Sequence, residues 1–390
     1  MYNFRVKIRV LLACLIFVWS IPTTAQITGE FYLDKTVFAP GEPVFLYLKI
    51  LNKGPDIASF AVLMQEQPFC SGVSLTISSD PPKISIHPDW TGCSWNGGPF
   101  PMMSLMPGQT TIGRFPLNYY HDINAPGNYW VEAKYFAFPN PAGVVPLTKL
   151  SFSVDGKLPS YAPSNYQPWL DQLKSTDQDT RQEAARVLAS LAPPSLEETL
   201  YGFANNSEFR RYAPLAFHRL NTPRSMQAMA DLMKGPLTNE QLDAARYLAE
   251  SNDQQWYPLL RDAAIKNVGD STFPACAAEL GGEKMLPVLI DLAKSADNKG
   301  IEGNALMAMG STGSRNAIPV LLEYLNDPDS NISDRAGYGL MLLTHRSAVV
   351  DSRNRDRKAE AVKWMDWWKR EGATAPIYKA TEQGERVPLP

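Results

Sequence analysis

The feature that most constrains the fold is a repeat of about 30 residues between residues 169 and 345. Each unit carries a small residue, an apolar anchor, a break of Gly, Pro or Asn, and a second apolar run. The anchors follow one another at spacings of 29, 29, 31, 29 and 33 residues. They are Leu191, Leu220, Ala249, Leu280, Met309 and Leu342. A repeat of this length predicts a solenoid of stacked helices, an architecture that binds other molecules.

Two segments show the repeat unit most completely. Residues 170–188 and 322–340 each run through Leu-x-x-Leu and Asp-x-Asp to an Arg that is followed by Ala and Leu. Acidic residues at such breaks cap the next helix, and alanine lets two helices pack closely. Pro258, Pro287 and Pro319 fall early in a second helix, where the missing N–H group is tolerated.

The pattern resembles HEAT repeats of the short bacterial type, in about five units over residues 169–345. Neither the Trp-Leu-Gly-Tyr pattern of TPR repeats nor the Thr-Pro-Leu-His signature of ankyrin repeats is present. The resemblance implies an all-α solenoid over residues 169–350.

Residues 351–390 should then close the array with a capping helix and a C-terminal tail. A helix over residues 357–370 places Ala361, Trp364, Met365 and Trp368 on one face. A terminal unit must cover the last apolar surface of a solenoid, and this Trp-rich helix is similar to the end of many exported bacterial HEAT proteins. A nucleic-acid platform is the alternative, because basic residues precede the aromatic ones. These basic residues are Arg353, Arg355, Arg357 and Lys358.

Between Ile27 and about Val154 the apolar residues instead alternate with a period of two. The alternation is clearest at residues 44–51, 129–135 and 150–154. Turns rich in Pro, Gly and Asn separate these runs. Six to eight short strands of this kind predict an all-β sandwich over residues 26–155.

The turns of this region carry a second resemblance. They read Pro-Gly-Glu-Pro at 40–43, Asn-Lys-Gly at 52–54, Met-Pro-Gly-Gln at 106–109 and Pro-Gly-Asn-Tyr at 126–129. In this order they resemble those of bacterial immunoglobulin-like extracellular domains and of BsuPI-type proteinase inhibitors. Gly127-x-Tyr129-x-Val131 also looks like a tyrosine corner, the start of a late strand in such sandwiches.

Residues 156–168 are expected to form a linker, because Pro159, Pro163 and Pro168 interrupt any regular period. A domain boundary near residue 160 follows. With a limited interface, each half should fold alone.

The N-terminus predicts a signal peptide over residues 1–25. Three basic residues precede an apolar run from Val10 to Ile21, and Thr-Thr-Ala at 23–25 is a small-residue cleavage site. A transmembrane helix is the competitor, but the run is shorter than the ~20 residues that a bilayer needs. Lipidation at Cys14 is less favoured, because most of the apolar run follows it. We therefore expect an exported protein, periplasmic or extracellular, with no membrane span after cleavage.

Charge and cysteine content narrow the class further. Cleavage removes three basic and no acidic residues from 37 Lys/Arg and 40 Asp/Glu, which leaves a net charge of about −6 and makes nucleic acid an unexpected partner. Cys70 and Cys93 are a disulfide candidate that encloses 22 residues, a bond that contributes about 3 kcal/mol in the chain-entropy model. Cys276 fills the small-residue position of its repeat and is expected to be a buried hydrophobe.

No pattern in the chain indicates catalysis. The four histidines, His87, His121, His218 and His345, never occur at metal-ligand spacing. Motifs for a nucleophile elbow, a phosphate loop or a zinc protease are not found. We predict that the protein is not an enzyme and that it needs neither a metal nor a cofactor.

A candidate binding surface emerges when the second helices are aligned on their prolines. Asp231, Asp262, Asp291 and Glu323 then occupy equivalent positions and should form one row. We expect this row to face solvent on the concave side of the solenoid, where a basic segment of a protein or peptide would neutralise it. A solvated surface without a partner is the other interpretation, since charges about 10 Å apart are screened at physiological salt.

The sandwich offers a second candidate in the loop from Asp89 to Met103, where Trp90, Trp95 and Phe100 stand among glycines and prolines. Exposed aromatic rings stack on sugars or fill a protease cleft, whereas buried ones would close one end of the sandwich. The favoured function is a non-catalytic exported scaffold that binds a protein or peptide through its HEAT surface. The alternative is a proteinase-inhibitor-like or carbohydrate-binding accessory protein that acts through the sandwich.

Overall fold

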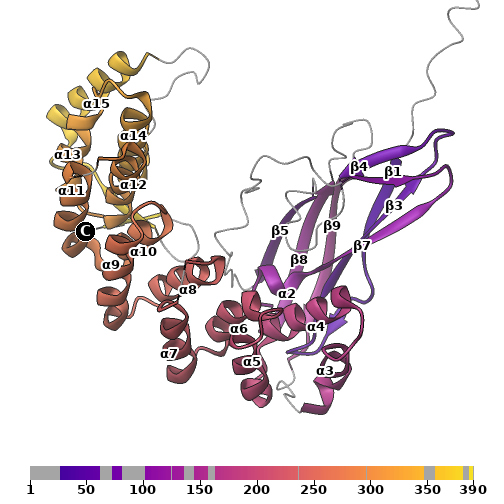
Figure 1. Ribbon diagram of the computed structural model, residues 1–390. Helices are drawn as coiled ribbons and strands as arrows, with labels where there is room; N and C mark the ends of the chain where they lie inside the picture. Colours follow the sequence, from indigo (N-terminus) through magenta and orange to yellow (C-terminus); the bar gives the residue numbers. More distant parts are fainter. Residues whose placement is uncertain are drawn as a thin grey trace, which may run out of the picture. The chain divides into compact units, whose positions relative to one another are not determined.

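The computed structural model describes residues 27–61, 73–80, 102–123, 125–135, 145–156, 163–235, 237–295, 297–346, 356–380 and 386–389. The chain divides near residue 158 into two compact units. The first unit is rich in strands and the second is helical, as expected (Figure 1).

The strand-rich unit contains two larger sheets. The first has the order β1-β3-β7 and is antiparallel, with strands β1 (Ile27–Leu33), β3 (Phe45–Asn52) and β7 (Thr110–Pro116). The second has the order β2-β9-β8-β5, with strands β2 (Val37–Phe38), β9 (Val145–Val154), β8 (Gly127–Tyr135) and β5 (Val73–Asp80). In it β2 pairs parallel with β9 and the other neighbours are antiparallel.

Smaller elements complete this unit. Strands β4 (Ala58–Ala61) and β6 (Met102–Leu105) pair with each other, and a short helix α2 (Leu117–Tyr120) follows β7. The described part of the unit thus holds nine strands, more than the six to eight that we expected. The excess includes the two-residue β2, which is too short to show an alternating pattern in the sequence.

The alternation of apolar residues places one face of each strand in a shared core. Leu46, Leu48 and Ile50 of β3 are fully buried, whereas Lys49 is exposed. Val131 and Ala133 of β8 join the same core from the second sheet. Burial of this kind stabilises by roughly 25 cal/mol per Å² of apolar surface, so the period of two selects which face turns inward.

Two polar groups tie the loops of the unit to the strands. The Tyr129 hydroxyl donates to the Ala125 carbonyl oxygen at 2.7 Å, which is the bond of a tyrosine corner. Buried Asn52 donates to the carbonyl oxygens of Asp56 and Leu105 and accepts from the Gly54 amide at 3.0 Å. The Asn-Lys-Gly turn is therefore held from within by the side chain of its own first residue.

The helical unit is built from two sets of helices. We call the even-numbered set the first row; it comprises α4 (Gln178–Leu191), α6 (Ala213–Leu220), α8 (Asn239–Glu250), α10 (Thr272–Gly281), α12 (Lys299–Met309) and α14 (Ser330–Thr344). The second row comprises α3 (Gln167–Gln172), α5 (Glu197–Ala204), α7 (Pro223–Leu232), α9 (Tyr257–Lys266), α11 (Leu286–Ser295) and α13 (Ala317–Tyr324).

The repeat period is visible in how these helices pack. Each first-row helix packs against the next one in its row, from α4 through to α14, and second-row helices pack against first-row neighbours. All six anchors of the 30-residue period lie on first-row helices, and four of them are buried. The period therefore marks one position per first-row helix, which is buried on four of the six helices.

Helix starts follow the capping pattern that we read from the sequence. Asp177 caps α4 by accepting from the Thr180 amide, and Asp329 caps α14 by accepting from the Asn331 amide. Pro258, Pro287 and Pro319 lie in the first turns of α9, α11 and α13, where no intrahelical N–H bond is lost.

The expected linker is partly helical. A 3-10 turn, η4 (Pro163–Tyr166), leads into α3, which packs against α4. Tyr166 is 2 % exposed. We predicted a linker from the prolines, but Pro163 and Pro168 both lie in the first turn of a helix, where proline is tolerated. Residues 163–168 thus belong to the helical unit.

The C-terminal segment contains an expected helix and an unexpected hairpin. In α15 (Arg357–Glu371) Ala361 and Trp364 are buried, but Trp367 is buried more fully than Trp368. After it, β10 (Ile377–Ala380) and β11 (Arg386–Leu389) pair antiparallel, and β10 packs against α14. A two-stranded hairpin therefore stands where we expected a tail.

No helix in these described ranges is long and apolar enough to cross a membrane. The signal-peptide segment 1–25 lies outside the described residues, and so do residues 157–162 of the expected linker.

Candidate functional site

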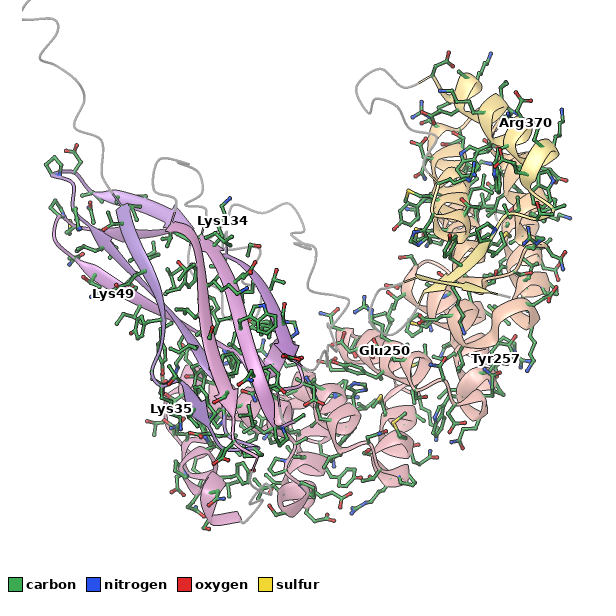
Figure 2. All side chains as sticks on the ribbon, turned by 180° about the vertical axis from the view of Figure 1, so that it is seen from behind. Lys35, Lys49, Lys134, Glu250, Tyr257 and Arg370 are labelled. Atoms are coloured by element: carbon green, nitrogen blue, oxygen red, sulfur yellow. The ribbon has the colours of Figure 1, made fainter. Side chains whose placement is uncertain are left out.

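The four carboxylates of the expected row each lie on a second-row helix. Asp231 is on α7, Asp262 on α9, Asp291 on α11 and Glu323 on α13, and all four side chains are exposed. Figure 2 labels Tyr257, the first residue of α9. The last three carboxylates each follow a first-turn proline by four residues, so helix geometry repeats their position from unit to unit.

Two of the carboxylates are already paired within their own repeat. The Lys234 ammonium lies 2.6 Å from Asp231 Oδ1, and this hydrogen bond is the main reason why the pKa of Asp231 is lowered. The Arg261 guanidinium donates to Asp262 Oδ1 at 2.8 Å and 3.0 Å. Exposed pairs of this kind contribute little to stability because water screens them, so a partner could replace them at little cost.

The other two carboxylates differ from these. Within the described ranges, no ion pair involves Asp291 or Glu323. The second-row helices and their ends also carry exposed or half-buried basic side chains, among them Arg224, Lys234, Arg261, Lys266 and Lys294. The row therefore lies on a mixed-charge surface. We call Asp291 with Glu323, which form no ion pair among the described residues, the acidic end of this row.

The contacts between helices also indicate whether this surface lies on the concave or the convex side of the array. Helices of the first row pack against one another throughout, whereas contacts between second-row helices are fewer. In a curved array of two rows, the closely packed row is the concave one. The carboxylates lie on the loosely packed row, so the contacts do not support our expectation of a concave position.

Several buried polar residues that could suggest a site prove to be structural ties. The Gln241 amide donates to the carbonyl oxygens of Leu232, Met233 and Gly235 beyond the end of α7. The Asn304 amide donates to Val268 and accepts from Arg335 at 2.7 Å, so it joins three successive repeats. Both side chains satisfy backbone or neighbouring groups, as buried polar groups must.

Of the remaining candidates, the aromatic loop and the disulfide lie outside the described residues, whereas Cys276 is described. Trp90, Trp95 and Phe100 of the sandwich loop lie outside the described residues, and so do Cys70 and Cys93 of the expected disulfide. Cys276 is a free thiol and is 5 % exposed, in agreement with a packing role. Across the described ranges, no three His, Cys, Asp or Glu side chains gather as metal ligands would.

Trp130 is a partly exposed residue of the strand-rich unit that the sequence analysis did not identify. Trp130 lies on the outer face of β8, opposite the buried face of Tyr129 and Val131. The alternation that identified β8 as a strand also assigns residues 128, 130, 132 and 134 to this outer face. The same alternation that identifies the buried residues of β8 therefore also predicts that the Trp130 indole is partly exposed.

Comparisons with known proteins add little to this description. No protein-family model matches the chain. No curated protein is similar to it at a significant level. A crystal structure of an engineered protein from the Northeast Structural Genomics Consortium aligns with 46 % of this chain and 96 % of its own, at 20 % identity and a TM-score of 0.28. A likeness at that score supports no conclusion about fold or function.

Proposed function

We propose that this chain is a non-catalytic exported scaffold, in which a HEAT-type α-solenoid binds a protein or peptide. The packing of the helical unit supports the proposal. Its first row is continuous from α4 to α14, and the second row adds a helix to each step. An array of this kind presents the same surface position once per repeat, which suits an extended partner. The immunoglobulin-like sandwich supplies the other half of the scaffold.

The observation that carries the binding surface is the recurrence of exposed charge on the second row. A partner segment that lies along α7, α9, α11 and α13 meets a carboxylate on each helix. Weak contacts at several repeats add up to useful affinity without any deep pocket. This arrangement favours a polypeptide partner over a small molecule.

Within this surface, Asp291 and Glu323 are the positions that favour a basic group of the partner. A Lys or Arg that approaches them breaks no ion pair that the described residues form. At Asp231 and Asp262 it must compete with Lys234 and Arg261. Substitutions of Asp231 and Asp262 can therefore serve as the control for substitutions of Asp291 and Glu323 on the same surface.

The experiment uses the mature chain, residues 26–390, immobilised to capture polypeptides from the exported fraction of its own organism. We expect at least one polypeptide to be retained by the wild type, to be retained more weakly by D231K/D262K, and to be lost from D291K/E323K. Retention should weaken as salt rises toward about 1 M, where the Debye length falls to about 3 Å. Equal retention by all three proteins would exclude the acidic end as the binding surface, and capture of no polypeptide would count against the scaffold itself.

Export has an independent test. If the N-terminal segment is a cleaved signal peptide, N-terminal sequencing of the protein from its native cells should begin at Gln26. A protein that begins at Met1, recovered from the cytoplasm, would contradict the exported assignment.

The alternative function, an inhibitor or carbohydrate-binding accessory that acts through the sandwich, is favoured by one observation. The outer face of the sheet β2-β9-β8-β5 carries the partly exposed indole of Trp130 among small polar residues. Of the two versions of the alternative, this face favours carbohydrate binding, because a protease cleft requires a projecting loop and this surface is the face of a sheet.

A further inference from the structure

The outer face of the sheet β2-β9-β8-β5 is organised around a single aromatic residue. Trp130 stands on β8, an inner strand of the sheet, and is half-buried. Its cross-strand partners are Ser78 on β5 and Ser151 on β9. Because both partners are serines, no large side chain stands beside the indole in its own row, and hydroxyl groups flank it on both sides.

The neighbouring row adds charged and hydroxyl groups. Thr76, Glu132 and Lys149 are aligned across the same three strands. Adjacent strands lie about 4.8 Å apart, and next-but-one residues along a strand about 7 Å apart. Hydrogen-bonding groups therefore surround the indole at distances that match the width of a hexose ring.

An ion pair stands beside the indole on this face. The Lys149 ammonium lies 3.2 Å from Glu132 Oε1 and 5.1 Å from the centroid of the Trp130 ring. Among the described residues, Lys149 makes the only recorded contact with the ring. One paired charge of each sign thus stands on one side of the indole, and Asp80 stands in the row on its other side. The exposed Lys149 side chain lies over the ring.

The outer face of the other large sheet is built differently. Tyr32 and Tyr47 stack on each other there, with ring centroids 5.0 Å apart and planes 12° apart. Arg114 covers the ring of Phe45 on the same face. Those rings lie against one another or against a guanidinium, whereas among the described residues the Lys149 ammonium is the one ring or cation partner of the Trp130 indole.

We propose that the Trp130 face is a binding site for a neutral carbohydrate. A hexopyranose ring would stack its apolar C–H face on the indole, and its hydroxyls would hydrogen-bond to Ser78, Ser151 and Glu132. The small hydroxyl side chains suit a ligand that is rich in hydroxyls, and the ion pair of Lys149 with Glu132 beside the indole does not call for a charged one. The open face of a sheet favours an extended, equatorially linked oligosaccharide. This site does not depend on the scaffold function of the helical unit.

The test titrates the mature chain with three probes, cellohexaose, chitohexaose and maltohexaose, by isothermal titration calorimetry. We expect at least one probe to bind with a Kd of about 1 mM or below. W130A should weaken that binding about tenfold or more. S78K, which keeps the indole and places a long side chain beside it, should do the same. Y32A, an aromatic substitution on the other sheet, should bind as the wild type does.

A substitution of Lys149 distinguishes a binding role of Trp130 from a packing role. If the ring is a binding platform, K149A should strengthen binding by about threefold, because the ammonium no longer competes for the indole. Circular dichroism of each variant establishes that its sheets are intact. Failure of all three probes to bind the wild type at millimolar concentration, or wild-type affinity in a folded S78K, would overturn the proposal.

Discussion

A close approach between the backbones of α12 and α14 predicts a loss of stability from one added methyl group. Gly339 lies inside α14, facing α12. A Cβ at Gly339 would lie 2.8 Å from the Leu306 carbonyl oxygen and 3.1 Å from Leu321 Cδ1. The approach is reciprocal, since a Cβ at Gly310 would lie 2.7 Å from the Gly339 carbonyl oxygen. The two backbones therefore pack in direct contact, with no room for a side chain.

The expected cost of Gly339→Ala combines two opposing effects. Overpacking against a backbone atom that cannot move aside costs typically 1–3 kcal/mol. Alanine, however, is about 1 kcal/mol better than glycine inside a helix. Because the clash involves the main chain of α12 rather than a flexible side chain, we expect the upper part of the cost range and a net loss of about 1–2 kcal/mol of unfolding free energy.

The matched control is Gly202→Ala in α5, where a Cβ would meet nothing within 4 Å. This variant keeps the helix-propensity gain without the clash, so its unfolding free energy should rise by about 1 kcal/mol. Urea unfolding of the mature chain, followed by far-ultraviolet circular dichroism, measures both midpoints. The reasoning fails if the two alanine variants shift the helical transition in the same direction.

Three further predictions concern single polar groups. Arg315→Ala removes the guanidinium that holds two backbone carbonyls after α15; the C-terminal hairpin should then exchange its amide hydrogens faster, by about tenfold or more. Tyr129→Phe removes the hydroxyl bond to Ala125 and should lower the stability of the strand-rich unit by about 1 kcal/mol in thermal unfolding. The hydrogen bonds that Asp177 accepts from Thr180 lower its pKa from 3.8. The Asp177 carboxylate therefore stabilises the fold at any pH above its ordinary pKa, and this stabilisation is lost as the pH falls through the lowered pKa. The stability difference between wild type and Asp177→Ala should vanish only in strong acid.

Local sequence signals predicted the elements well where burial and hydrogen bonding act on the same residues. The alternation at residues 44–51 corresponds to β3, and that at 129–135 to β8. The 30-residue spacing fell on first-row helices throughout. These signals succeed because a period of two or of about 3.6 decides which side chains share a face, whatever the face packs against.

The same signals failed where the neighbour decides the outcome. Trp367 and Trp368 are adjacent, and a helix turns by about 100° between them. Which of them is buried depends on the position of α13, against which α15 packs. The hairpin β10–β11 likewise docks on α14, and Arg315 holds the segment before it from far away in the chain.

The carboxylates of the candidate binding surface show that sequence patterns do not predict which ion pairs form. Asp231 with Lys234 and Asp291 with Lys294 have the same spacing, yet only the first pair is recorded as an ion pair among the described residues. An exposed pair is worth 0–1 kcal/mol, so small differences in local surroundings select the side-chain rotamers. Equivalence in sequence therefore does not establish equivalence in electrostatics.

The sequence by itself determined that a strand-rich unit precedes a helical one, that prolines and acidic residues start the helices, and that one carboxylate recurs on each of α7, α9, α11 and α13. Those properties follow from period, capping and backbone geometry within a few residues. Only the tertiary structure decided which row packs continuously, which carboxylates are paired, and that Trp130 has small polar neighbours. Those properties depend on residues brought together from distant parts of the chain, whose contacts no local pattern encodes.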